Sequence, residues 1–151
     1  MKLLIAAAGF TKSKQDLKSI YLTFIRSVLE QSAVVWHSSL VKRNINDLER
    51  IQKAALRVIM GKQYITYKNS LKESNLGTLE KRRETLCLKF AKNCLKNEKL
   101  KDMFPVKKIK HKMKKRNENK YEMKKNRTKR LEMSALPYMR KLLNDENKRK
   151  N

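Results

Sequence analysis

Turn-forming and aromatic residues are scarce in this 151-residue sequence, which has 3 Gly, 2 Pro and only 7% aromatic residues. A sheet needs turn residues to connect its strands, whereas the many Leu, Lys, Glu and Ala residues are good helix formers. No apolar run approaches the length of a membrane-spanning helix. The composition therefore predicts an all-α protein without a membrane span.

Residues that build catalytic or metal centres are also few: 14 Asp and Glu, 2 Cys and 2 His. Cys87 and Cys94 have no further Cys or His at ligand spacing, and a helix holds them too far apart for a disulfide. We expect both thiols in the core, which suits an intracellular protein. The four aspartates are isolated and no Gly-rich phosphate loop is present, so we expect no enzyme activity, no metal and no cofactor.

Positive charge dominates the rest of the composition, with 39 Lys and Arg and a formal net charge of +25. Such a charge attracts polyanions and opposes compaction through self-repulsion. Residues 1–104 have 21 Lys and Arg against 9 Asp and Glu, whereas residues 105–151 have 18 against 5 in under half the length. This shift predicts a helical domain over residues 1–104 and a basic tail over residues 105–151.

Two amphipathic helices joined by a short polar turn are predicted between Asp16 and Gly61. In the second helix, Asn46 and Glu49 match a capping pattern, and Gly61 suits the left-handed position after a helix. Its apolar residues recur at three- and four-residue steps on one face, and its cations fall on the opposite face. The apolar residues are Leu48, Ile51, Ala55, Val58 and Ile59, and the cations are Arg50, Lys53 and Arg57.

Further helices are predicted on both sides of this pair, including a short one that ends at about Glu73. The first helix of the pair has Ser13 as its cap and a broad apolar face, and Arg26 can join Glu30 one turn later. A long helix follows a Thr78 cap, again with apolar residues on one side and cations on another. The apolar run over residues 3–10 resembles a minimal signal peptide, but it is short, so we favour a packed helix.

Beyond residue 104 the apolar periodicity is lost in a dense run of cations. Such a segment buries too little apolar surface to offset its ordering entropy, so residues 105–151 are predicted to be largely disordered, with one short helix after Ser134. Residues 107–116 fit a basic nuclear-import signal or a phosphate-binding tract as well as a solvated tail. The predicted fold is therefore a small bundle of three to four helices with a disordered basic C-terminal tail.

Two sequence motifs are specific enough to suggest a family: Y-x-x-F-I-R-x-V-L-E-x-x-x-x-V-W, starting at Tyr21, and L-E-R-x-Q-K-A-A, starting at Leu48. Together they resemble the region after the polymerase palm in reverse transcriptases of non-LTR retrotransposons, the jockey-like and related LINE elements. The similarity continues through Leu79-Glu80 to about Phe104-Pro105. It implies a thumb and post-thumb region: a fragment of an RNA-directed DNA polymerase that lacks the palm aspartates and is catalytically inactive.

In that family the thumb grips the template–product duplex behind the active site. The resemblance and the charge together imply non-specific binding to the phosphate backbone of RNA or DNA. The residues predicted to make these contacts are Arg50, Lys53, Arg57, Lys81, Arg82, Arg83, Lys107, Lys108, Lys110, Lys112, Lys114, Lys115 and Arg116.

Other interpretations of the same features stay open. The broad apolar face also suits a helical protein–protein interaction module with a nuclear-targeting tail, which docks on a missing palm and fingers region or on itself. Binding to a membrane surface is disfavoured, because Tyr121 and Tyr138 are the only large aromatics in the basic tail. We expect the protein in the nucleus or the cytoplasm.

Overall fold

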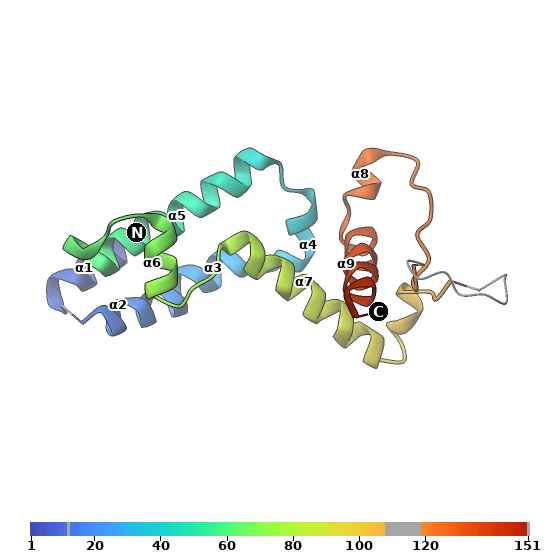
Figure 1. The fold of residues 1–151 in the computed structure, drawn as a ribbon, viewed down its shortest axis with the longest axis horizontal. Helices are drawn as coiled ribbons and strands as arrows, with labels where there is room; N and C mark the ends of the chain where they lie inside the picture. The colour runs from blue at the N-terminus through green and yellow to red at the C-terminus, as the bar shows by residue number, and fades with distance from the viewer. Residues whose placement is uncertain (12, 108–118, 151) are drawn as a thin grey trace. The chain divides into compact units, whose positions relative to one another are not determined.

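The computed structural model describes residues 1–11, 13–107 and 119–150, which form helices and their connections (Figure 1). No β-strand occurs within these ranges, so the predicted all-α class is confirmed for them. None of the helices in this described part combines the length and the apolar character needed to cross a bilayer. The chain divides into two compact units: unit 1 comprises Met1–Ala33 and Leu40–Arg83, and unit 2 comprises Val34–Ser39 and Glu84–Asn151.

Unit 1 is built around one long helix, α5, which spans Lys42–Met60. The other elements are α1 (Lys2–Phe10), α2 (Lys14–Ile20), the π-helical η1 (Tyr21–Arg26), α3 (Ser27–Glu30), η3 (Gly61–Gln63) and α6 (Tyr67–Glu73). The segments α2, η1 and α3 follow one another without interruption. The helices α1, α2 and α6 each contact α5 (Figure 1).

Local capping signals in the sequence are confirmed at three helix ends. The Ser13 hydroxyl accepts the N–H of Asp16 at 3.4 Å at the start of α2. The Thr78 hydroxyl accepts the N–H of Lys81 at 3.3 Å at the start of α7, which spans Leu79–Lys96. Gly61 ends α5 with a φ of +53°, a conformation that glycine adopts without steric cost.

The predicted start of α5 at Asn46 is wrong. The helix begins at Lys42, so Asn46 lies within it. The predicted capping partner, Glu49, instead accepts hydrogen bonds from the Tyr67 hydroxyl and, at 2.9 Å, from the N–H of Glu80 in the first turn of α7. A carboxylate at a helix N-terminus satisfies a free backbone donor and interacts favourably with the helix dipole. Glu49 thus stabilises a different helix from the one that its spacing suggested.

The apolar faces of unit 1 meet in one core. Its buried residues are Leu4, Leu17, Tyr21, Ala55, Leu56, Ile59 and Leu71. Leu4 is fully buried, so the segment over residues 3–10 is a packed helix, as we favoured. Burying a leucine side chain contributes about 1.5–3 kcal/mol, so these contacts supply much of the drive for folding.

A polar cluster around Gln52 lies at the edge of this core. The Tyr21 hydroxyl donates to Gln52 Oε1 at 2.7 Å, and Gln52 Nε2 donates to the Tyr67 hydroxyl and to the Gly77 carbonyl, both at 3.0 Å. Gln52 and Tyr21 are buried, so their polar groups depend on these hydrogen bonds in place of water. One amide therefore joins η1, α5, α6 and the segment that leads into α7.

Unit 2 packs most of α7 against the C-terminal helix α9, which spans Ala135–Lys150. Its shorter elements are η2 (His37–Ser39), η4 (Lys101–Met103) and α8 (Lys129–Glu132), and α4 (Ala33–Trp36) contributes Val34, Val35 and Trp36. The buried core residues are Cys87, Ala91, Cys94, Phe104, Tyr121, Met139 and Leu143. The predicted core position of both cysteines is confirmed.

The C-terminal helix contradicts the prediction of a largely disordered tail. Residues 135–150 form a 16-residue helix, longer than the short helix predicted after Ser134. Lys92 pairs with Glu146 at 2.6 Å, and Arg140 donates to the Met103 carbonyl through Nε at 3.1 Å and Nη2 at 2.6 Å. The boundary that the charge distribution suggested at residue 104 therefore does not separate two compact units.

Buried Asn144 fixes the chain at the far end of the basic run. Its Oδ1 accepts the N–H of Tyr121 at 2.9 Å and its Nδ2 donates to the Tyr121 carbonyl at 3.1 Å. Tyr121 also forms an isolated antiparallel bridge with Val106. The two ends of the run, at Val106 and Tyr121, are therefore held side by side on unit 2.

The predicted number of three to four helices is too low for the described part of the chain, where the helical segments run from α1 to α9. The helix predicted from Ser13 ends at Glu30, and Ser32 follows with a φ of +52°. A positive φ is unfavourable inside a helix, so the chain turns there before α4. The periodicity of apolar residues predicts helical structure correctly, but it does not indicate where one helix ends and the next begins.

Replacing Gln52 by leucine should destabilise unit 1. The substitution leaves the buried Tyr21 hydroxyl without the amide oxygen that accepts its hydrogen bond, at a cost of about 1–3 kcal/mol in unfolding free energy. Urea unfolding followed by far-ultraviolet circular dichroism measures the change. The control is Gln15→Leu, at an exposed position of α2, which should stay within about 0.5 kcal/mol of the parent. Equal midpoints for Gln52→Leu and the parent would show that the cluster contributes nothing.

Alkaline pH should also destabilise unit 1 through its tyrosines. Burial raises the pKa of the Tyr21 hydroxyl well above its ordinary value, and burial followed by the Glu49 hydrogen bond does the same for the pKa of Tyr67. The unfolded chain loses these protons near pH ~10 while the folded chain keeps them, so stability is complete below that pH and falls as pH rises.

The Tyr21→Phe variant isolates this effect, since it differs from the parent by one hydroxyl group. Between about pH 9 and pH 11 its urea midpoint should fall less steeply than that of the parent. Parallel curves for the two proteins would contradict the assignment.

Candidate nucleic-acid interface

The outward face of α5 carries a row of cations. Successive residues turn by about 100° around a helix, which places Arg43, Arg50, Lys53 and Arg57 within one sector. All four are exposed, whereas Gln52, Ala55, Leu56, Ile59 and Met60 are buried on the other side. The row is about 21 Å long from Arg43 to Arg57, at about 1.5 Å per residue. We call these four cations the α5 surface.

Little negative charge offsets the α5 surface. Arg50 pairs with Asp47 at 3.4 Å, but their side chains are 81% and 53% exposed. A pair so open to water contributes little stability, and salt weakens it further. Arg57 lies over the Tyr64 ring at 5.5 Å, which leaves its charge intact. Within the described residues no carboxylate pairs with Lys53 or Arg57, so the predicted cations of α5 are available to an anionic ligand.

The three predicted cations at the start of α7 differ from one another in surroundings. Lys81 is exposed. Arg82 contacts the Glu30 carboxylate at 3.2 Å. Glu30 also pairs with Arg26 at 3.5 Å, which confirms the predicted pair of Arg26 and Glu30 one turn apart. Arg83 is 0% exposed, so its predicted role as a surface contact is wrong for this conformation. Its position explains the burial, because it lies four residues after buried Leu79, one turn along the helix.

The predicted contacts in the basic run are only partly described. Lys107 is exposed, and its backbone N–H donates to the Lys120 carbonyl at 2.9 Å. The remaining predicted residues of this run lie outside the described residues: Lys108, Lys110, Lys112, Lys114, Lys115 and Arg116.

A second group of exposed cations follows this run and was not among the predicted contacts. The group consists of Lys120, Lys124, Lys125, Arg127, Lys129 and Arg130, which we call the α8 surface. It is anchored at one end by Asn144 on the backbone of Tyr121, and at the other end α8, whose Thr128 cap accepts the N–H of Leu131 at 3.2 Å, contacts α9. The sequence alone could have indicated this group, because residues 120–130 have six Lys and Arg and only one acid, Glu122.

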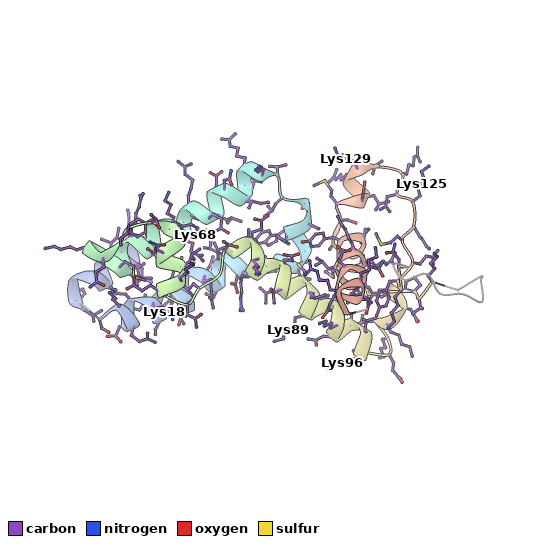
Figure 2. All side chains as sticks on the ribbon, viewed as in Figure 1. Lys18, Lys68, Lys89, Lys96, Lys125 and Lys129 are labelled. Carbon is purple, nitrogen blue, oxygen red and sulfur yellow. The ribbon has the colours of Figure 1, made fainter. Side chains whose placement is uncertain are left out.

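Figure 2 shows cations on both units, with the labelled lysines extending away from the ribbon. Lys18 and Lys68 lie on α2 and α6 of unit 1. Lys89 and Lys96 lie on α7, and Lys125 and Lys129 belong to the α8 surface. Each unit thus presents positive charge to solvent over its own core.

Metal ligands and reactive thiols are a second kind of site to consider in residues 1–11, 13–107 and 119–150. Nowhere in these ranges do three His, Cys, Asp or Glu side chains gather as a metal site requires. The two cysteines are buried in α7, and burial raises the pKa of the Cys94 thiol, which disfavours the reactive thiolate. What the exposed side chains supply is positive charge, arranged in one row on α5 and one segment before and within α8.

Comparison with known proteins identifies no relative of this chain. No protein-family model matches the chain, and neither a curated protein nor a solved structure does so. The resemblance to the thumb region of non-LTR reverse transcriptases therefore stays a prediction that rests on the motifs starting at Tyr21 and Leu48.

Proposed function

We propose that this chain binds the phosphate backbone of RNA or DNA without sequence preference. The observation that carries the proposal is the α5 surface, where Arg50, Lys53 and Arg57 are exposed on one face of a helix whose other face is core. Cations that neutralise phosphates release condensed counterions, and this release supplies most of the affinity in non-specific binding.

The geometry of α5 suits a repeating anionic ligand. Arg50, Lys53 and Arg57 follow one another at steps of three and four residues, so these neighbouring side chains are about 5–6 Å apart along the face. Arg57 is steadied by the Tyr64 ring, which reduces the entropy lost when it contacts a phosphate. A rigid row of charges therefore meets a backbone with little rearrangement.

The resemblance of the two motifs also supports a proposal about the origin of this chain. We infer a catalytically incomplete C-terminal fragment of a non-LTR retrotransposon reverse transcriptase, with α5 in the part that resembles the thumb. The two motifs support it, since they span the segment from η1 through the middle of α5. Such a fragment does not polymerise DNA by itself. Primer extension by the purified chain would contradict this part of the proposal.

Neutralising the α5 surface should weaken binding and reduce its salt dependence. The variant carries Arg50→Gln, Lys53→Gln and Arg57→Gln, and the probe is a labelled oligonucleotide of about 40 nucleotides, long enough to cover the whole chain. Fluorescence anisotropy between about 50 and 200 mM salt should show affinity reduced about tenfold at the low end and a slope of log K against log salt smaller by about two to three.

The matched control removes the same charge elsewhere on unit 1, through Lys18→Gln, Lys68→Gln and Lys72→Gln. This control should keep a larger share of the affinity, because α2 and α6 lack a comparable row of cations. Equal losses in the two variants would show that total charge governs binding. No binding by the parent protein in dilute buffer would refute the proposal.

A second function is favoured by exposed apolar side chains on unit 1. Phe24 and Val28 are 59% and 66% exposed and lie one turn apart on the segment from η1 to α3. Leu3, Ile5 and Phe10 of α1 are exposed as well. Exposed apolar groups of this kind mark protein contacts, which supports an interaction module that binds another protein or a second copy.

Self-association through this face is open to a direct test. Size-exclusion chromatography with light scattering should show a dimer that Phe24→Ser with Val28→Ser converts to a monomer, because the exposed apolar pair is lost. The control is Val41→Ser with Ile65→Ser, which removes two equally exposed apolar residues from other parts of unit 1. A parent protein that is monomeric at every concentration would exclude self-association.

A further inference from the structure

The two cationic surfaces belong to different compact units. The α5 surface lies in unit 1, whose core is centred on Leu56 and Tyr21, and the α8 surface lies in unit 2, whose core is centred on Cys87 and Leu143. Each unit is itself strongly basic: unit 1 has 16 Lys and Arg against 6 Asp and Glu, and unit 2 has 23 against 8. Either surface therefore attracts a polyanion without help from the other.

Both surfaces are held in place by their own unit. The α5 surface is the outer side of a 19-residue helix whose inner side is buried. At the α8 surface, Asn144 fixes the backbone at Tyr121, and Thr128 caps α8. Ion pairing does not neutralise the group, because no carboxylate pairs with Lys124, Lys125 or Arg127 in the described part of the chain. The second surface is thus a concentration of positive charge on a segment whose two ends contact unit 2.

Neither surface offers a platform for stacking bases. Tyr121, the only aromatic residue between 120 and 130, is buried at 6% exposure. Tyr64, beside the α5 surface, is partly covered by the guanidinium of Arg57. Single-strand binding proteins that hold bases use exposed aromatics for that purpose. A strand held here through its phosphates keeps its bases free to pair.

We propose that the chain holds two nucleic-acid strands at once, one on each surface, and so promotes annealing of complementary strands. This inference rests on the proposed backbone binding. Mutual repulsion of the phosphates slows the encounter of two strands, and a polycation that holds both offsets that repulsion. Holding both on one protein also raises the effective concentration of one strand near the other.

Stoichiometry is the first test of the inference. An unlabelled DNA oligonucleotide of about ten nucleotides is titrated into the full chain by isothermal calorimetry in low salt, where backbone contacts are strongest. Two oligonucleotides should bind per chain. Only one should bind after Arg50→Gln, Lys53→Gln and Arg57→Gln, and only one after Lys124→Gln, Lys125→Gln and Arg127→Gln. The control with Lys18→Gln, Lys68→Gln and Lys72→Gln should still bind two.

Annealing is the second test. Two complementary DNA strands, one with a donor and one with an acceptor fluorophore, are mixed with the full chain, and energy transfer reports the rate of duplex formation. The parent and the control should accelerate annealing, and either surface variant should reduce that acceleration about tenfold because one strand is no longer held. Circular dichroism confirms that each variant keeps the helical content of the parent.

The outcomes separate this inference from the proposed function. A parent chain that binds one short oligonucleotide and leaves the annealing rate unchanged refutes the two-strand inference and leaves backbone binding intact. Full annealing by both surface variants also refutes it, since one surface then suffices. A parent chain that binds no oligonucleotide refutes both.

Discussion

Self-repulsion among 39 cations is the constraint that shapes this structure. A chain so unbalanced folds only if its few carboxylates act where they stabilise most. Glu30 pairs with both Arg26 and Arg82, and Glu146 pairs with Lys92. Glu49 binds the Tyr67 hydroxyl and a backbone donor of α7. These acids hold helical segments together within each unit, which leaves Asp47 beside the α5 surface and Glu122 within the segment of the α8 surface.

The polar cluster around Gln52 follows the same logic. A neutral amide joins three helices of unit 1 without adding charge, and it satisfies donors and acceptors that water would otherwise solvate. The hydroxyls of Tyr21 and Tyr67 are neutral at neutral pH, as those of ordinary tyrosines are, so these two side chains add no charge to the cluster. Unit 1 therefore keeps its positive charge outside, where a polyanion can reach it.

Sequence periodicity predicted the features that depend on a single helix. The cationic face of α5, the pairing of Arg26 with Glu30 and the caps at Ser13 and Thr78 all follow from local spacing, and the structure contains them. The cysteine positions in the core follow from the apolar stripe of α7.

The errors arise where contacts between distant segments decide the outcome. Glu49 matched a capping box, but Tyr67 and the first turn of α7 compete for it more effectively than Asn46. The helix α9 follows a dense run of cations, and its residues Met139 and Leu143 are buried in one cluster with Phe104 and Tyr121, which belong to other segments of the chain. Only the burial of Arg83 could have been predicted from the sequence, because its four-residue spacing from Leu79 places it on the apolar face of α7.

The chemistry of the exposed cations argues for holding a backbone over reading a sequence. Specific base recognition relies on arginine or amide side chains free to form two parallel hydrogen bonds with a base edge. On α5, the guanidinium of Arg57 lies over the Tyr64 ring, and Lys53 has no planar group that could form such a pair of bonds. Lysine, a point charge without a preferred direction, predominates on the α8 surface. Such groups position a strand through its phosphates and leave its bases for another strand to recognise.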